Sequence, residues 1–313
     1  MVAGIEGIVC GLSAFYTPPC ALFAGRRGDR YILGMRVLIT GATSGIGRAC
    51  AEHLAAHGHT VIATGRSSAT LAELEVLARA KGWSLHALHL DVTDPSEVAS
   101  VAEEVKQRFG GIDAVMNNAG YGQAGFFADV TTEQVREQFS TSFFGLFDVT
   151  RAFLPQLIDS RGLVVNVGSI MGRMTAPWMG TYGAVKAAVR SLTETMRVEL
   201  AAVHVRVVLL EPGSVESSFH VRAVAERQEA HPETSPFAAA NHWLRDNEYS
   251  PLFLMRSVPA LAVARLVRRI IESPRPRARY VTPLAARFLL LFMAIMPGRI
   301  MDPLKRRVFH VAA

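Results

Sequence analysis

Cysteine, charge and long apolar runs are all scarce in this chain of 313 residues. The three cysteines, Cys10, Cys20 and Cys50, have the spacing of neither metal ligands nor a disulfide framework. The sequence therefore predicts no metal site and fits a reducing, cytoplasmic compartment. No run of 18 or more apolar residues is free of charge, which excludes a predicted transmembrane helix. Hydrophobic residues make up 50% of the chain and charged ones 19%, a balance that allows a sizeable core.

Acidic residues are rare towards the C-terminus. From Arg265 to the end, eleven Lys and Arg residues stand against two acids, Glu272 and Asp302, which gives this part a net charge of +9. The whole chain carries +6, so the remainder is at −3. The basic character belongs to the tail and not to the body, and we expect no nucleic-acid partner.

The first 34 residues lack helical or strand periodicity. Their charges also oppose the order of a signal peptide, because Glu6 comes early and Arg26, Arg27 and Arg30 come late. We predict that residues 1–34 are a disordered leader or reflect a misassigned start, with the working domain opening at Met35.

From Met35 onward, short apolar runs alternate with helical stretches. Strands are expected at Val37–Ile39, Thr60–Ala63, Leu85–Leu90, Ala114–Met116, Leu163–Val167 and Val205–Leu210. Helices are expected at Gly47–Ala56, Ala69–Ala80, from about Pro95, across Thr132–Leu157 and around Tyr182. Such alternation predicts a Rossmann-like, doubly wound α/β domain with a parallel sheet. Ligands bind such sheets beyond the carboxyl ends of the strands.

A glycine-rich turn, Thr40-Gly41-Ala-Thr-Ser44-Gly45-Ile46-Gly47, joins the first predicted strand to the first predicted helix. Glycines let the backbone turn tightly and approach a pyrophosphate, which then lies at the helix N-terminus. The turn therefore predicts a nucleotide-binding loop.

Tyr182 and Lys186 are four residues apart and so share one helix face. An ammonium beside a phenol stabilises the phenolate and lowers the phenol pKa. The pair is expected to exchange a proton with an alcohol or a carbonyl near neutral pH.

The glycine-rich turn and the Tyr182–Lys186 pair occur in one chain with Asn117-Asn118-Ala119-Gly120, Ser169 and Pro212-Gly213. In their order and spacing, these five motifs resemble the short-chain dehydrogenase/reductase family over about Met35 to Val281. The resemblance implies one domain, residues 35–281, and a homo-oligomeric oxidoreductase that transfers hydride between a nicotinamide cofactor and a secondary alcohol or carbonyl. It implies catalytic roles for Ser169, Tyr182 and Lys186. The cofactor-binding residues it implies are Gly41, Ser44, Ile46, Gly47, Asp91, Asn118, Gly120, Tyr182, Lys186, Pro212, Gly213 and Ser217, to which the position of Arg66 after the second predicted strand adds Arg66.

Ser142 departs from the family pattern. Family members usually carry an asparagine there, which holds a water between the lysine and solvent. A serine hydroxyl also binds water but is shorter and has different donors. We therefore place Ser142 among the catalytic residues, as a relay of altered efficiency; the alternative, which the intact Ser169, Tyr182 and Lys186 favour, is a tolerated substitution.

Cofactor choice depends on the end of the second predicted strand. Gly65 stands where an acid would bind the ribose of NAD, and Arg66 follows it. An arginine there accommodates the 2′-phosphate of NADP, so NADP(H) is favoured over NAD(H). Ser44 stands where many NADP enzymes carry a basic residue and counts against this preference.

Two segments bear on the substrate. Residues 214–259 are expected to form a lid over it, and their apolar side chains favour an apolar molecule such as a steroid, a retinoid or a lipid. These side chains are Phe219, Phe237, Trp243, Phe253, Leu254 and Met255. Tyr121-Gly-Gln-Ala-Gly125 is loosely similar to the 17β-hydroxysteroid and retinol dehydrogenase branch. The alternatives are an acyl-dihydroxyacetone-phosphate-type reductase and a cofactor-binding sensor or scaffold.

The tail, residues 282–313, combines the nine apolar residues Phe288–Met296 with flanking cations. Nine residues cannot span a bilayer. The alternatives are packing over the active-site mouth, packing in a dimer and contact with an anionic membrane surface.

Overall fold

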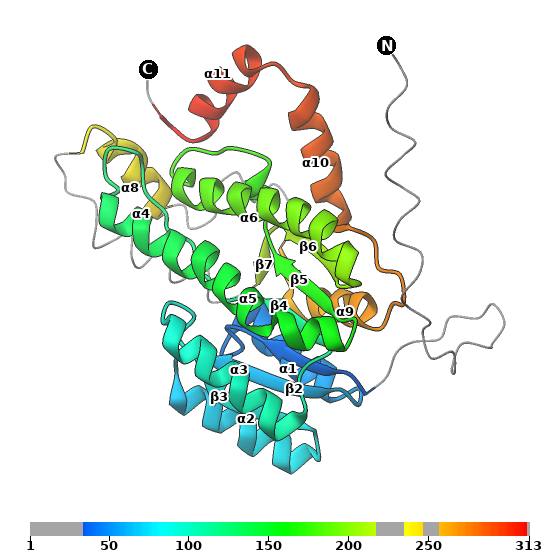
Figure 1. Cartoon of the computed structure of the whole chain (residues 1–313). Coiled ribbons are helices and arrows are strands. Elements are labelled where there is room, and N and C mark those ends of the chain that lie inside the picture. Colours follow the sequence, from blue (N-terminus) through cyan, green and yellow to red (C-terminus); the bar gives the residue numbers. More distant parts are fainter. Residues whose placement is uncertain (1–33, 217–234, 247–256, 312–313) are drawn as a thin grey trace, which may run out of the picture. The chain divides into compact units, whose positions relative to one another are not determined.

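In the computed structural model, the described residues are 34–216, 235–246 and 257–311. They all fall within one compact unit, Tyr31–Ala313. Its central sheet has seven parallel strands in the order β3-β2-β1-β4-β5-β6-β9 (Figure 1). The strands are β1 (Arg36–Ile39), β2 (Thr60–Gly65), β3 (Leu85–His89), β4 (Ala114–Asn117), β5 (Leu163–Val167), β6 (Arg206–Pro212) and β9 (Arg279–Thr282). The predicted doubly wound α/β fold is confirmed.

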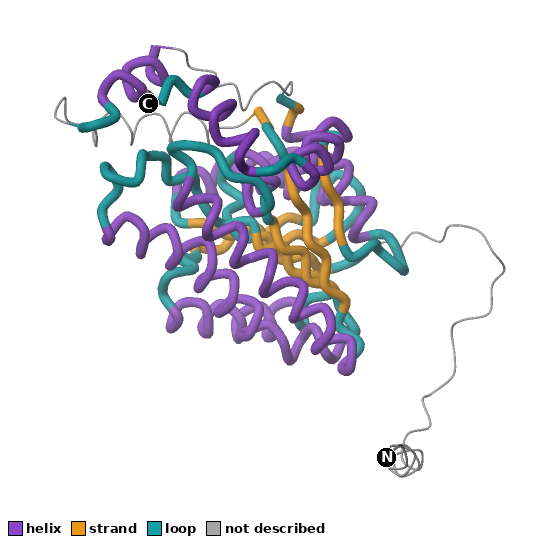
Figure 2. The backbone as a smooth tube through the Cα atoms, turned by 90° about the horizontal axis from the view of Figure 1, so that it is seen from above, coloured by secondary structure: helices purple, strands orange, loops and turns teal. Residues whose placement is uncertain are grey.

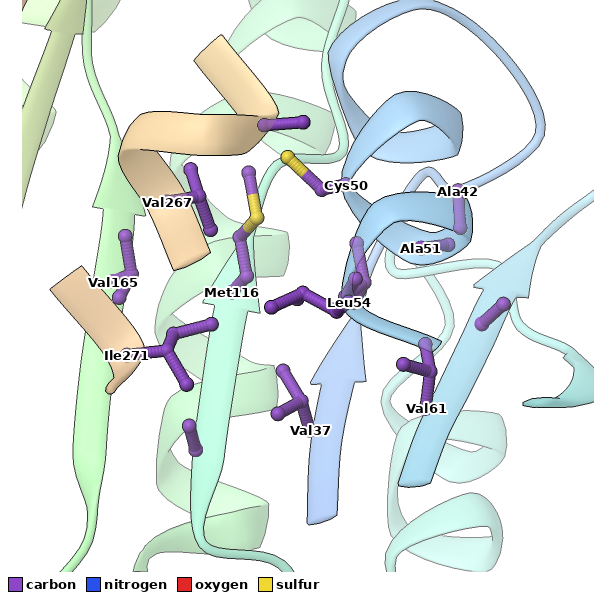
Figure 3. Close-up of a cluster of buried hydrophobic side chains, with 14 of the residues drawn as sticks. Val37, Ala42, Cys50, Ala51, Leu54, Val61, Met116, Val165, Val267 and Ile271 are labelled. Carbon is purple, nitrogen blue, oxygen red and sulfur yellow. The ribbon is translucent and has the colours of Figure 1, made fainter. Parts of the chain in front are cut away.

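Helices cover both faces of this sheet (Figure 2). On one face, α1 (Gly45–Ala55), α2 (Ser68–Lys81) and α9 (Ala260–Ile271) pack against the strands, and Figure 3 shows part of that core. On the other face lie α3 (Pro95–Phe109), α5 (Gly145–Asp159) and α6 (Gly180–Glu199). The strands between them are apolar on both sides, as a parallel sheet requires; all five residues of β5 are buried.

Local sequence signals set several helix boundaries. Asp94 caps α3 by accepting hydrogen bonds from the backbone N–H groups of Ser96 and Glu97, and Pro95 occupies the first turn. Gly110 then ends the helix in the left-handed conformation, at φ 70°.

Six of the seven strands match the predicted ones, and β9 was not predicted. Its sequence Arg-Tyr-Val-Thr is polar at both ends and its residues are only partly buried, because β9 lies at the edge of the sheet, where among the described strands it pairs with β6 alone. The predicted helix Thr132–Leu157 consists of α4 (Thr132–Phe139), a π-helical segment η1 (Ser140–Phe144) and α5. A π-helical turn was not predicted because its side chains continue the helical pattern.

Apart from η3 (Leu200–Val203), the remaining described elements lie beyond the carboxyl end of the sheet. They are η2 (Ile170–Gly172), β7 (Val215–Glu216), β8 (Val258–Pro259), α8 (Ala238–Asp246), α10 (Leu284–Ile295) and α11 (Gly298–Val308). The turn η3 joins the end of α6 to the start of β6, at the opposite edge of the sheet. Of the expected lid, residues 214–216, 235–246 and 257–259 are described. The expected leader lies outside the described residues except for Gly34.

Candidate active site

A cavity of about 470 Å³ opens beyond the carboxyl ends of the strands. Most of the predicted site residues line it together: Gly41, Ser44, Ile46, Arg66, Asp91, Asn118, Gly120, Ser169, Tyr182, Lys186, Pro212 and Gly213. Gly47 and Ser142 are buried behind this lining, and Ser217 lies outside the described residues.

Two positions of the glycine-rich turn, Gly41 and Gly47, leave no room for a side chain. A Cβ at Gly47 would lie 2.2 Å from the carbonyl oxygen of Gly41, and Gly41 itself has φ 66°. The side-chain amide of Asn118 donates to the carbonyls of Thr40 and Gly41, at 3.0 and 3.1 Å. Asn118 therefore holds the turn in shape, a structural role beyond the cofactor contact that the family resemblance implies.

The N-terminus of α1 faces this cavity. Ser44 is its N-cap residue, yet its side chain makes no capping hydrogen bond, and the first turn contains no acid. Unsatisfied N–H groups and the positive end of the helix dipole favour an anion there. The glycine turn and the N-terminus of α1 thus fit a cofactor pyrophosphate, because no side chain of the glycines blocks its approach to the backbone N–H groups.

At another side of the cavity, Arg66 and Asp91 face each other with 3.8 Å between Nη1 and Oδ2. Burial tends to raise the pKa of Asp91, but hydrogen bonds from Thr93 and the charge of Arg66 lower it below its ordinary value. A Cβ at Gly65 would lie 2.6 Å from Cγ2 of Thr43, so an acid at position 65 would require Thr43 to shift. Ser67, which also lines the cavity, was missed although it directly follows Arg66.

Ser169, Tyr182 and Lys186 meet at the end of β5. Ser169 is the N-cap residue of η2, and its Oγ accepts a hydrogen bond from the Met171 backbone N–H at 3.1 Å. Tyr182 hydrogen-bonds to Ser169. Lys186 Nζ donates to the carbonyl of Val167 at 2.8 Å and lies 5.8 Å from the centre of the Tyr182 ring. All three side chains are buried, so a proton exchanged here is shielded from bulk water.

The pKa of Tyr182 differs from the expectation drawn from the tyrosine–lysine spacing. Burial raises it to about 12, although the hydrogen bond with Ser169 acts in the opposite direction. Burial also lowers the pKa of Lys186 to about 8. The spacing suggested a lowered tyrosine pKa because it shows the neighbouring charge but not the desolvation of both groups. Tyr182 is therefore a protonated phenol at neutral pH, ready to donate.

Gly172 sets the distance between the Ser169 turn and α6. A Cβ at Gly172 would lie 2.6 Å from the carbonyl oxygen of Lys186. The absence of a side chain lets η2 lie directly on the backbone of α6, which brings Ser169 to Tyr182.

Ser142 lies in η1, inside the continuous helix formed by α4 and α5. Its Oγ accepts a hydrogen bond from Gln138 Nε2 at 2.9 Å. Gln138 is fully buried, also donates to the carbonyl of Tyr121, and accepts from the Gln123 N–H. A Cβ at Gly120 would lie 2.9 Å from this Oγ, so Ser142 supports the floor of the cavity at that point. A π-helical turn at such a position is typical of functional sites, and the water relay through Ser142 stays a prediction.

Sequence reasoning missed the apolar wall of the cavity, formed in part by Met171, Trp178 and Met179. Met171 and Met179 belong to a buried cluster with Tyr182, and side chains of α10 and α11 complete it. Phe237 of the expected lid stacks on Phe126, with ring centroids 4.6 Å apart. The wall follows Ser169 and precedes Tyr182 in sequence, a position that could have identified it.

The family model described as short chain dehydrogenase matches residues 35–228. Dehydrogenase/reductase SDR family member 7B from Mus musculus is 31% identical over 203 residues, 63% of this chain and 63% of that protein. The 3-ketodihydrosphingosine reductase from Bacteroides thetaiotaomicron is 34% identical over 185 residues, 58% of this chain and 65% of that protein. The chain thus spans less than two thirds of the length of these relatives.

Solved structures agree over a larger part of the chain. A short chain dehydrogenase/reductase from Burkholderia phymatum in complex with NAD has a TM-score of 0.71 and 29% identity, covering 85% of this chain and 94% of that one. An alcohol dehydrogenase from Thermococcus sibiricus complexed with 5-hydroxy-NADP has a TM-score of 0.65 and 26% identity, covering 79% and 95%. The first was solved with NAD and the second with an NADP derivative, which supports a nicotinamide cofactor in the cavity described above.

Proposed function

This chain belongs to the short-chain dehydrogenase/reductase family, and on that premise we propose that it reduces a carbonyl group of an apolar, lipid-like molecule with NADPH. The observation that carries the proposal is the meeting of Ser169, Tyr182 and Lys186 at one end of the cavity whose other parts fit a dinucleotide. The cofactor, when bound, supplies the hydride.

The side chains of the chain supply the proton and the orientation. Tyr182 donates its phenolic proton to the carbonyl oxygen of the substrate as that oxygen gains negative charge. Ser169 hydrogen-bonds the same oxygen and holds the carbonyl in place. Lys186 binds the nicotinamide ribose and keeps positive charge near the phenolate that forms. At neutral pH Tyr182 is in the protonated state that donation to the carbonyl oxygen requires.

The substrate class rests on the apolar wall. Met171, Trp178 and Met179 offer aliphatic, sulfur and aromatic surface beside Tyr182. One relative is named a 3-ketodihydrosphingosine reductase, which agrees with a long-chain ketone. A steroid or a retinoid would use the same wall.

A substrate panel tests the proposal. We expect loss of NADPH absorbance with long-chain 3-keto lipids, steroid ketones or retinal, and none with short polar ketones. The panel includes an acyl-dihydroxyacetone phosphate, because preference for it would replace the proposed substrate class. Tight NADPH binding without turnover of any carbonyl would instead support a cofactor-binding sensor.

Arg66 is expected to select NADPH over NADH. Arg66→Ala removes a charge-assisted contact with the 2′-phosphate, so KM for NADPH should rise roughly 10- to 100-fold while KM for NADH changes little. Steady-state kinetics with both cofactors measure this. Arg79→Ala, which removes an exposed arginine from α2, is the control. Equal effects of Arg66→Ala on both cofactors would contradict the phosphate contact.

Lys186 is expected to make cofactor binding depend on pH. Because the pKa of Lys186 is about 8 in the free protein, its ammonium is present below pH 8 and is lost above it. The Kd for NADPH should be level below that pH and rise about tenfold per pH unit above it. Fluorescence titration across this range measures the Kd. The Lys186→Met variant should bind more weakly at neutral pH and show no break near pH 8. A level Kd in the unaltered protein would show that binding does not need the ammonium.

A further inference from the structure

Helix α10 leaves an apolar stripe open to solvent. Its buried side, with Ala286 and Leu290, packs on the cluster that contains Tyr182. On the opposite side, apolar residues recur at the i, i+4, i+7 and i+11 positions of one helix face. These residues are Leu284, Phe288, Leu291 and Ile295, and they are 60% to 66% exposed. Continuous exposed apolar surface of this kind marks a binding face.

Cations accompany this stripe in the sequence. From Leu284 to Val311 the chain has five Lys and Arg residues and one acid, a net charge of +4. Met301 in α11 is buried, as is Phe309 directly after the helix, whereas Arg299, Arg306 and Arg307 are exposed on the other side of α11 together with Ile300. Lys305 is tied to the body through Thr175 Oγ1, at 2.8 Å. Figure 1 shows both helices at the end of the molecule beyond α6, away from α2 and α3.

The length and charge of these helices decide between the possible occupants of the face. The twelve residues of α10 are about 18 Å long, far short of a hydrocarbon core of about 30 Å. In the described part of the chain, no helix is long and apolar enough to cross a membrane. A second copy seated on the same face across a two-fold axis would bring two basic tails together, which is unfavourable.

We propose that α10 and α11 dock this chain on an anionic lipid surface, with the stripe of α10 among the acyl chains and the arginines of α11 at the headgroups. Exposed apolar side chains that include phenylalanine, combined with exposed cations on the next helix, are what binds such an interface. The buried side of the same helices covers the cluster around Tyr182. Docking therefore brings the apolar wall of the cavity close to the lipid from which an apolar substrate would enter. That last step rests on the proposed function, whereas docking itself does not.

Vesicle sedimentation of the full chain tests the proposal without any need for turnover. We expect it to pellet with vesicles of phosphatidylcholine and phosphatidylglycerol, to do so far less with phosphatidylcholine alone, and to be released by salt. Leu291→Glu should weaken binding by roughly tenfold or more. The double variant Arg306→Gln/Arg307→Gln should weaken it roughly thirtyfold, at about fivefold per charge.

Val76→Glu is the matched control, because Val76 on α2 is 62% exposed and Leu291 is 60% exposed. This control should bind vesicles like the unaltered chain, and NADPH titration should show that all variants are folded. Failure of the unaltered chain to pellet with anionic vesicles would overturn the proposal. It would also be overturned if Val76→Glu lost as much binding as Leu291→Glu. If the unaltered chain binds no vesicles, light scattering would show whether it forms a dimer. A dimer that Leu291→Glu breaks would assign the face to a second copy of the chain.

Discussion

Tyr182→Phe is expected to lower kcat for carbonyl reduction by roughly a thousandfold while NADPH binding stays unchanged. General acid catalysis contributes about 10²- to 10⁴-fold, and phenylalanine keeps the ring while removing only the proton donor. The ring packs in the cluster with Met171 and Met179, so the substitution should leave the fold intact. Single-turnover kinetics and a fluorescence titration of NADPH measure the two effects separately.

The raised pKa of Tyr182 identifies the phenol as the proton donor in this prediction. With the phenol protonated up to about pH 12 in the free protein, Tyr182 already carries at neutral pH the proton that reduction requires. Ser169→Ala removes the hydroxyl that hydrogen-bonds this phenol and should lower kcat less than Tyr182→Phe does. A Tyr182→Phe variant that kept a tenth of the activity would show that the proton comes from another group.

The sequence predicted the sheet from local patterns, and the resemblance to the short-chain dehydrogenase/reductase family implied the grouping of the site residues. Continuous apolar runs such as Leu163–Val167 identify buried strands, and parallel strands place the residues after them at one edge. Gly41, Ser169 and Pro212, which the family resemblance assigned to one site, lie at the ends of such strands and line one cavity.

Other features depend on contacts between residues that are distant in sequence. Strand β9 is specified by pairing with β6 and not by its own composition. The pKa of Tyr182 is set by burial under the cluster that α10 and α11 complete, more than by its spacing from Lys186. The π-helical turn at Ser142 shows no break in side-chain pattern, and its hydrogen bond with Gln138 appears only once the helix is folded.

Gly47→Ala is expected to weaken NADPH binding by roughly a hundredfold and to destabilise the fold by about 1–3 kcal/mol. The added methyl would lie 2.2 Å from the Gly41 carbonyl oxygen and 2.5 Å from the Asn118 amide nitrogen, far inside contact distance. Neither atom can move freely, because Asn118 is hydrogen-bonded to Thr40 and Gly41. The turn must therefore open where it would hold the pyrophosphate.

Gly180→Ala separates this clash from the general effect of adding a methyl group. A Cβ at Gly180, the first residue of α6, would meet no atom of the described residues within 4 Å. That variant should bind NADPH normally and be as stable as the unaltered chain or up to about 1 kcal/mol more stable, because alanine favours a helix. NADPH titration and denaturant unfolding of both variants provide the comparison. If Gly47→Ala bound NADPH as well as Gly180→Ala, the glycine turn would not be the pyrophosphate site, and the anion would have to lie elsewhere along the N-terminus of α1.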